Sequence, residues 1–256
     1  MSTRKQSAIG VALAVGIIVA WALVHGLAVF LYPWDRLGLV PALLVIALQC
    51  WLCVGLFIVA HDCMHGTLVP RRPGWNWAFG TVCLALYACF NFSALNPKHH
   101  LHHRYSGTGR DPDFLEHPPR GFWRWYVKFF GEYFSWGQLG LLAVVNWTYI
   151  LVLGAPVANV LLFWALPAIL SSLQLFTFGT YLPHVPTTDE PFNDRHHARS
   201  NDYPVWLSLL TCFHFGYHHE HHLHPGIPWW RLPTVHAGSR TPQDAQQRVH
   251  RNQSIE

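Results

Sequence analysis

Long stretches without a formally charged side chain constrain the fold of this chain more than any other feature. Residues 8–32, 37–60 and 75–97 contain no Asp, Glu, Lys or Arg, and after Glu132 the next charged residue is Asp189. Only 12% of the 256 residues are charged, whereas a soluble domain carries roughly 25%. Because a helix of about 20 apolar residues crosses the hydrocarbon core of a bilayer, the sequence predicts an all-α integral membrane protein.

Four transmembrane helices in two hairpins account for these stretches. The segment Gly154-Ala155-Pro156 has the composition of a turn and divides the longest stretch into two spans. The predicted spans are residues 8–32, 37–60, 138–154 and 157–183. Residues 75–97 are expected to re-enter the membrane or to lie at its interface. We expect residues 1–233 to form one membrane domain, and residues 234–256, rich in Gln, Arg and Ser, to form a flexible cytoplasmic tail.

The distribution of Lys and Arg predicts the orientation of these spans. With this topology, all of the 17 Lys and Arg residues except Arg36 lie on one side of the membrane. Because Lys and Arg are enriched in cytoplasmic segments, we expect a multi-pass protein of the cell inner membrane with a cytoplasmic N-terminus. A full crossing by residues 75–97 would place the cations of residues 98–132 outside, so we favour re-entry. The net charge of +4 reflects this topology and gives no support for nucleic-acid binding.

Histidine is the second unusual feature, since the 19 His residues outnumber Lys and Arg together. Most of them fall in short clusters, and each cluster adjoins the predicted cytoplasmic end of an apolar segment. Helical spacing places the predicted ligands of each cluster on one face, whereas His100 points aside. His184 lies at the inner end of the last span. The predicted ligands are His61 and His65; His99, His102 and His103; His218, His221 and His222; and His184.

Imidazoles at this density indicate a metal centre. Packed together, they would lose hydration without gaining a partner, unless a metal ion supplies one. Their number exceeds the four ligands of a structural zinc site, so a pair of metal ions explains them best. Imidazole suits iron, copper and zinc. A redox-active pair that activates dioxygen fits the pattern better than a hydrolytic site, although the spacing alone does not identify the metal.

At these clusters the sequence resembles the membrane fatty-acid desaturase and hydroxylase superfamily, whose members carry three histidine boxes. The resemblance is closest to the bacterial β-carotene ketolase family, and it covers about residues 45–233. The segments that carry it are residues 61–66, 102–104, 111–114, 182–184, 195–200, 209–225 and 228–233.

The resemblance implies helical spans that carry a cytoplasmic helical cap, in which the nine predicted ligands hold two iron ions and O2 is the co-substrate. Six further side chains are candidates for orienting the ligand rings. They are Asp62, Asp111, Asp113, His214, Glu220 and His224.

The resemblance also implies the reaction. The C4 methylene of a β-ionone ring would be oxidised to a ketone by two successive O2-dependent hydroxylations, taking β-carotene to echinenone and canthaxanthin, and zeaxanthin towards astaxanthin. The chain has no dinucleotide fingerprint and no iron–sulfur cysteine spacing. We therefore expect an external electron donor, such as a ferredoxin, to dock at the cytoplasmic face.

Three alternatives remain open at this stage. A carotenoid 3-hydroxylase or an acyl-lipid desaturase would carry the same histidine boxes and differ in the substrate groove. A histidine-rich membrane metal transporter belongs to a different class, and it should place ionisable ligands near the middle of its spans. Here only His25 lies well inside an apolar stretch.

Overall fold

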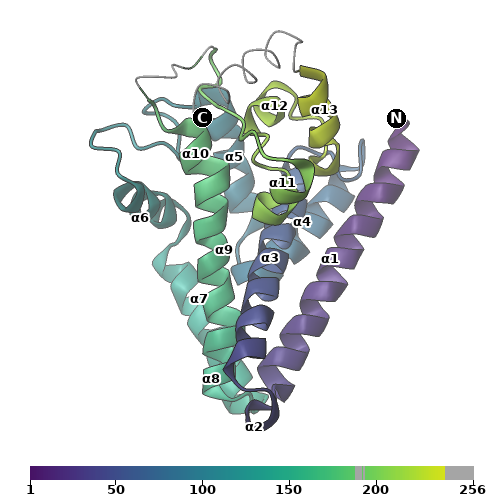
Figure 1. Cartoon of the computed structure of the whole chain (residues 1–256), viewed down its shortest axis with the longest axis vertical. Helices are drawn as coiled ribbons and strands as arrows, with labels where there is room; N and C mark the ends of the chain where they lie inside the picture. The colour runs from purple at the N-terminus through teal and green to yellow at the C-terminus, as the bar shows by residue number, and fades with distance from the viewer. Residues whose placement is uncertain (188–191, 193, 240–256) are drawn as a thin grey trace, which may run out of the picture.

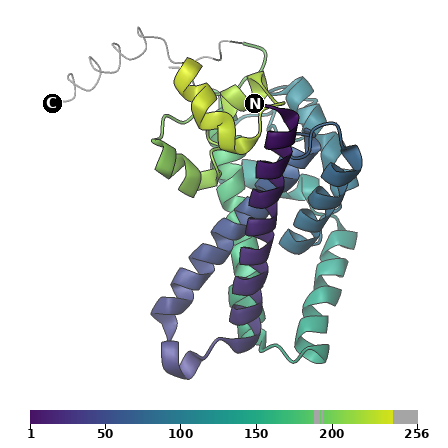
Figure 2. The same ribbon diagram turned by 90° about the vertical axis from the view of Figure 1, so that its right-hand side faces the viewer.

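The computed structural model describes residues 1–187, 192 and 194–239. Every regular element in this part of the chain is a helix, which confirms the all-α prediction. The helices converge at a narrow end around α2 and α8 and spread towards a wide end (Figure 1). The N-terminus lies at the wide end, as do α5, α10, α12 and α13, and a view turned by 90° shows the same placement of the N-terminus (Figure 2).

Three helical runs are long and apolar enough to cross a membrane. The mean hydropathy of an 18-residue stretch within each run is 2.5, 2.6 and 1.8, in chain order. They coincide in position with the expected spans 8–32, 37–60 and 157–183. The runs are α1 (Thr3–Leu31), α3 (Leu39–Met64) and Val157–His184, the last made of α8 (Val157–Val160), η2 (Leu161–Ala165), α9 (Leu166–Phe176), η3 (Thr177–Tyr181) and α10 (Leu182–His184). The short helix α2 (Trp34–Leu37) joins the first two runs at the narrow end.

Apolar side chains cover the outside of these helices. On α1, Leu23 is 60% exposed and Leu27 is 59% exposed, and on α3 Leu44 is 69% exposed. Exposed leucines arranged along a long helix have no favourable partner in water, but lipid tails solvate them without cost. The outer surface is therefore that of a membrane protein.

Two pairs of helices are sharply bent. Helix α4 (Pro73–Ala88) meets α5 (Phe92–Tyr105) at 100°, and α6 (Phe122–Tyr133) meets the run Trp136–Val152, which comprises α7 (Trp136–Trp147) and η1 (Thr148–Val152), at 80°. If each pair counts as one span, the number of candidate spans rises to five. The first bend falls in the segment expected to re-enter. It depends on Cys89, which adopts a left-handed conformation with φ 57°, and on Asn91, whose side chain caps the first turn of α5. The bend turns α5, with its histidines, into the wide end.

Helix α3 is the central element of the packing. From Leu52 to Met64 nearly all of its side chains are buried, and it packs against α1, α4 and α9. Its last residues therefore have little freedom to move, and they include His61. The core of the molecule thus fixes the first histidine cluster.

The wide end is covered by the C-terminal part of the described chain. This cap consists of α11 (Val205–Cys212), α12 (His218–Leu223), η4 (Trp229–Arg231) and α13 (Leu232–Ser239). The expected flexible tail was placed from residue 234, and this boundary is wrong, because residues 234–239 continue α13. His236 of α13 is buried and donates to Glu220 at 2.6 Å, which ties this helix to α12. The rest of the expected tail, residues 240–256, lies outside the described residues.

The contact between α4 and α5 makes a testable prediction at Gly80. A Cβ added at this glycine would lie 2.2 Å from the ring of Phe92, which is itself buried. We expect Gly80→Ala to destabilise the fold by about 1–3 kcal/mol through overpacking, measured as a lower melting temperature in detergent.

Gly74→Ala is the matched control on the same helix, because a Cβ there meets nothing within 4 Å. It should leave the melting temperature unchanged or raise it slightly, since alanine is the better helix former. Equal melting temperatures for the two variants would contradict the packing at Phe92.

Candidate metal centre

The nine predicted ligands meet at the wide end, contributed by four separate segments. They come from the end of α3 and from α5, α10 and α12. The side chains form two groups, and within each group the potential ligand atoms all lie within 4.8 Å of one another. The first group is His61, His65, His99, His103 and His221; the second group is His102, His184, His218 and His222. Each of the nine predicted ligands belongs to one of the two groups. His100, which was not predicted as a ligand, is exposed and belongs to neither group.

The ring nitrogens lie so close together that neutral imidazoles cannot form a hydrogen bond at every contact. In the second group, His218 Nε2 lies 2.9 Å from His184 Nε2 and 3.0 Å from His222 Nε2. One ring nitrogen offers either one N–H or one lone pair, so it cannot form both hydrogen bonds. In the first group, both ring nitrogens of His61 are buried without a hydrogen-bond partner. Groups of this kind fit a shared cation, because imidazole ligands at roughly 2.1 Å from one ion lie within about 4.2 Å of each other.

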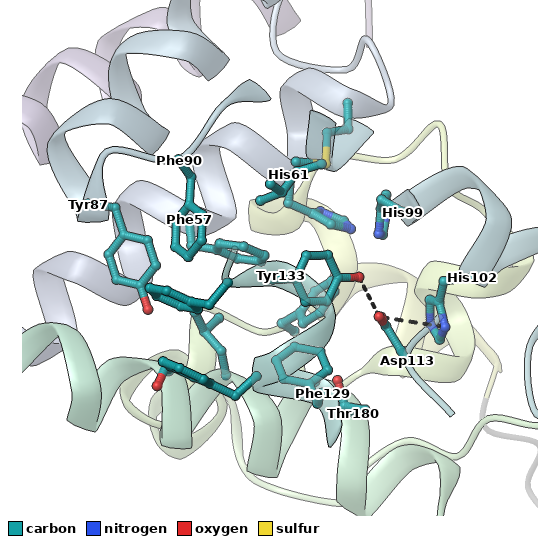
Figure 3. Close-up of a pocket in the computed structure, with 18 of the residues that line it drawn as sticks. Phe57, His61, Tyr87, Phe90, His99, His102, Asp113, Phe129, Tyr133 and Thr180 are labelled. Atoms are coloured by element: carbon teal, nitrogen blue, oxygen red, sulfur yellow. Dashed lines mark hydrogen bonds and ion pairs between the residues drawn. The ribbon is translucent and has the colours of Figure 1, made fainter. Parts of the chain in front are cut away.

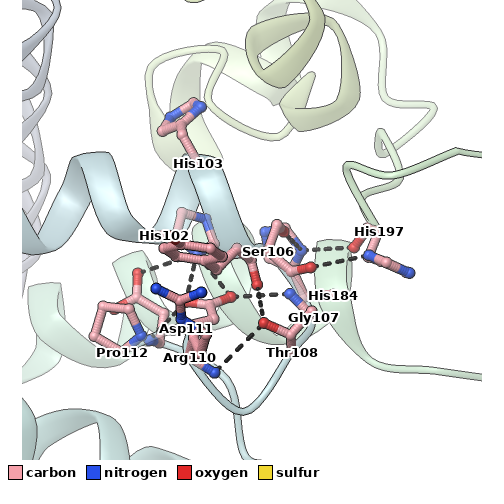
Figure 4. A network of polar contacts seen from close by, with 12 residues as sticks. His102, His103, Ser106, Gly107, Thr108, Arg110, Asp111, Pro112, His184 and His197 are labelled. Atoms are coloured by element: carbon pink, nitrogen blue, oxygen red, sulfur yellow. Dashed lines mark hydrogen bonds and ion pairs between the residues drawn. The ribbon is translucent and has the colours of Figure 1, made fainter.

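Two rings of the second group, those of His102 and His184, are oriented by hydrogen bonds at their far nitrogens. His102 Nδ1 donates to Asp111 at 3.0 Å, and His184 Nδ1 donates to the carbonyl oxygen of His197 at 2.7 Å (Figure 4). Both bonds leave Nε2 with its lone pair towards the centre of the group. Hydrogen bonds of this type fix the tautomer and raise the basicity of a ligating histidine.

Asp111 is held as a carboxylate. Its oxygens accept hydrogen bonds from the backbone N–H groups of Gly107 at 3.0 Å and Asp113 at 2.8 Å, in addition to His102. Burial alone would raise the pKa of Asp111, but His102 and these N–H groups outweigh burial and lower it below its ordinary value. The ionised form is the one that can accept all of these bonds.

The three predicted ligands on α12 are kept neutral by their surroundings. Burial and the neighbouring histidines lower the pKa values of His218, His221 and His222 well below the ordinary value. A neutral imidazole is the form that binds a metal ion. At pH 7 these rings are therefore ready to act as ligands.

The two groups differ in their access to solvent. All members of the second group are buried, whereas His65, His99 and His103 of the first group are only half-buried. The first group is therefore the more exposed of the two.

Of the six candidate orienting side chains, three lie beside predicted ligands. Asp111 bonds to His102, as described. Asp113 Oδ2 lies 3.7 Å from His102 Nδ1. Asp62 Oδ1 lies 3.9 Å from His61 Nδ1, and its other oxygen accepts from the backbone N–H of Trp229 at 3.3 Å.

The other three candidates have different surroundings. His224 is exposed, and the ring of His214 lies next to those of Tyr217 and Trp229. Within the described part of the chain, neither forms a hydrogen bond to a predicted ligand. Glu220 accepts from His236 and from Ser200. Burial alone would raise the pKa of this carboxyl, but these hydrogen bonds bring it to about 2. Glu220 therefore holds the cap together and does not bond to a ligand ring.

An apolar pocket adjoins both groups. It is reached by His61 and His99 of the first group and by His102 and His218 of the second. Figure 3 shows His61, His99 and His102 on one side and Phe57, Tyr87 and Phe90 on the other. Further aromatic lining comes from α6 and the residue after it, namely Phe129, Phe130, Tyr133 and Phe134. The pocket can hold an apolar ligand so that one end of the ligand lies at the two histidine groups.

Sequence reasoning gave no role to His197 or to Tyr133. His197 acts through its backbone carbonyl, which any residue type could supply, so the sequence carries no signal for it. Tyr133 lines the pocket and donates a hydrogen bond to Asp113. The amphipathic aromatic pattern of residues 122–134 could have drawn attention to this segment.

Comparison with known proteins identifies similar chains over most of the length. The fatty acid desaturase family model matches residues 35–147 and 138–254. A beta-carotene ketolase of Paracoccus sp. (strain PC1) is 48% identical over 239 residues, which are 91% of this chain and 96% of that protein. A beta-carotene ketolase of Paracoccus sp. (strain N81106 / MBIC 01143) is 50% identical over 86% of this chain and 89% of that protein. An sn-1 oleoyl-lipid 12-desaturase of Anabaena variabilis is 27% identical over 70% of this chain and 63% of that protein.

The bond between Asp111 and His102 generates a prediction about metal affinity. We expect Asp111→Asn to weaken metal binding by about 10–100-fold, the usual effect of removing a carboxylate that orients a ligating histidine. The measurement is the dissociation constant of Fe²⁺ in competition with a chelator.

Asp194→Asn is the matched control, because Asp194 pairs with His219 at 2.7 Å and His219 belongs to neither group. Its affinity should equal that of the unchanged protein. If both variants lose metal equally, the orienting role of Asp111 is wrong.

Proposed function

This chain belongs to the fatty acid desaturase family, and we propose that within this family it is a β-carotene ketolase. The observation that carries the proposal is the near-full-length similarity to two proteins of that name, combined with the two histidine groups at the end of an apolar pocket. The similarity to a lipid desaturase is lower, at 27% identity, and membership of the same family is enough to explain it. Its activity would be the oxidation of the C4 methylene of a β-ionone ring to a ketone.

We propose that the nine histidines of the two groups hold two iron ions, one per group, with O2 as co-substrate. Iron bound there would supply the activation of dioxygen for hydroxylation of a C–H bond. The protein contributes neutral imidazoles, the carboxylate of Asp111 as an orienting group and a largely buried position. Asp62 and Asp113, close to His61 and His102, would assist in the same way.

The pocket suits a carotenoid. A β-ionone ring has no polar group, and an aromatic lining can surround it without leaving a hydrogen bond unmade. Because His61, His99, His102 and His218 line one side, a ring carbon in the pocket would face both metal groups. A carotenoid partitions into the bilayer, which matches the apolar outer surface of the helices.

Two rounds of hydroxylation at the same carbon would form the ketone. Each round consumes one O2, two electrons and two protons and releases one water. The first product is an alcohol, and the second is a geminal diol that loses water. Treatment of both rings of β-carotene would give echinenone and then canthaxanthin, and zeaxanthin would lead towards astaxanthin.

For the topology we propose four spans in two hairpins, with residues 75–97 re-entrant. The 100° bend between α4 and α5 and the distribution of Lys and Arg support this arrangement. It places the N-terminus and both histidine groups in the cytoplasm, in a protein of the inner membrane. An external electron donor such as a ferredoxin would approach the same face.

The alternatives differ in how well they fit. A carotenoid 3-hydroxylase or an acyl-lipid desaturase would use the same two groups, but the ketolase relatives, at 48–50% identity, are closer in sequence than the lipid desaturase at 27%. A metal transporter would need ligands in the middle of its spans. The midspan His25 instead packs between Trp21 and Tyr149, with its Nε2 3.3 Å from the tyrosine hydroxyl.

Expression in a β-carotene-producing bacterium tests the activity. We expect 4-keto carotenoids to accumulate, and His103→Ala to reduce them to background because the first group loses a ligand. His117→Ala, at an exposed position in the loop before α6, is the control and should retain full activity. An unchanged pigment profile despite membrane insertion would contradict the ketolase assignment, and a 3-hydroxylated product would favour the 3-hydroxylase.

The electron requirement is tested with purified protein in lipid nanodiscs. Turnover should depend on an added reductase and a small electron-carrier protein, because the chain holds no dinucleotide or iron–sulfur motif. Oxygen consumption coupled to ketone formation is the measurement. Sustained turnover without any reductant would refute the need for a donor.

A further inference from the structure

One polar group of the pocket stands out by its position. The hydroxyl of Tyr133 donates a hydrogen bond to Asp113 Oδ1, and the other oxygen of this carboxylate lies 3.7 Å from His102 Nδ1. Figure 3 shows Tyr133, Asp113 and His102 on the side of the pocket where His61 and His99 lie. The pocket therefore carries a hydroxyl group next to the two histidine groups.

The Tyr133 hydroxyl is held in place. Its acceptor, Asp113, is fixed by two hydrogen bonds. The backbone N–H of Asp113 donates to Asp111 Oδ1 at 2.8 Å, and the indole N–H of Trp125 donates to the Asp113 carbonyl oxygen at 2.6 Å. The ring of Tyr133 packs against Phe129 with 5.1 Å between ring centroids, and Lys98 Nζ lies 5.3 Å from its centroid. The hydroxyl oxygen thus keeps one orientation.

The Tyr133 hydroxyl oxygen can still accept a hydrogen bond. A tyrosine hydroxyl donates one hydrogen bond and can accept others, and its proton is used by Asp113. Tyr87, Ser172 and Thr180 also bring hydroxyl groups to the pocket, and those of Tyr87 and Ser172 are engaged elsewhere. That of Tyr87 accepts from Ser171 at 3.1 Å, and that of Ser172 donates to the Ile169 carbonyl at 2.7 Å. In Figure 3 Tyr87 also lies on the side opposite the histidines.

We propose that Tyr133 is a positioning residue that retains the alcohol formed in the first oxidation, so that the same carbon is oxidised again. This inference rests on the proposed ketolase function, in which a ring must be hydroxylated twice at one carbon. β-Carotene has no group that Tyr133 can bind. The 4-hydroxyl of the first product can donate to the Tyr133 oxygen, which would keep C4 at the metal groups.

Each oxidation balances in atoms and electrons. The ring methylene reacts with one O2, two electrons and two protons to give a secondary alcohol and water, so that one C–H bond breaks and one C–O bond forms. The alcohol reacts with a second O2, two electrons and two protons to give the geminal diol and water. The diol loses water to give the ketone. The electrons come from the external one-electron protein donor, and Tyr133 is neither oxidised nor consumed.

Tyr133→Phe tests this role through the product ratio. In a β-carotene-producing host the unchanged protein should give mainly ketone. The variant should release more of the 4-hydroxy carotenoid, with the ratio of alcohol to ketone raised roughly three- to tenfold, the effect of one lost hydrogen bond. A variant that is only less stable would lower both products together and leave the ratio unchanged.

Tyr126→Phe is the matched control on the same helix. Tyr126 is bonded to Ser172 at 2.7 Å and does not line the pocket, so its removal should leave the product ratio as it was. An unaltered ratio in Tyr133→Phe, with ketone still formed, would overturn the inference. Absence of ketone from the unchanged protein would instead overturn the proposed function, so the two failures are distinguishable.

A binding measurement does not require turnover. Protein loaded with Zn²⁺ in lipid nanodiscs is titrated with β-carotene and with its 4-hydroxy derivative, and binding is followed by the quenching of tryptophan fluorescence. The unchanged protein should bind the alcohol more tightly, and Tyr133→Phe should lose roughly three- to tenfold of that preference. If the unchanged protein binds the alcohol no more tightly than β-carotene, the inference is wrong even when the variant fails to fold.

Discussion

Imidazole nitrogens from four separate segments face one another at 2.7–3.0 Å, and the rest of the structure serves to hold them there. Such an arrangement has no favourable hydrogen-bond solution by itself. The packing around α3 and the bend after α4 must therefore supply the rigidity that keeps the rings together. The cap adds to this through the bond between His236 and Glu220. The two groups are thus an outcome of the whole fold and of no single helix.

Eight of the nine histidines in the two groups could be identified from their helical spacing in the sequence, and His184 from its position at the end of the last span. All nine predicted ligands lie in the two groups. The division between groups could not be predicted, since His102 and His103 are adjacent in the sequence and belong to different groups. The relative placement of α3, α5, α10 and α12 decides that division. The long apolar runs were equally predictable, since their length and lack of charge suffice.

Features that depend on contacts between distant segments were harder to predict from the sequence. The helix at residues 234–239 was missed, because these residues were grouped with the polar segment that follows them and the packing of His236 on Tyr217, at 4.1 Å between ring centroids, is a contact between distant segments. Among the carboxylates, Asp111 and Glu220 looked equivalent as candidates. Their different partners follow from the loop that brings Asp111 back to His102 and from the position of α13. Every residue type carries a backbone carbonyl, so the role of the His197 carbonyl could not be predicted from the sequence.

The unequal burial of the two groups has a consequence for the exchange of bound ions. Under the proposed function, an ion held by the first group would lie beside the partly exposed rings of His65, His99 and His103, whereas an ion held by the second group would have only buried ligands. The first ion would then exchange with solvent more readily than the second, and the two halves of the centre would differ in how fast they are loaded.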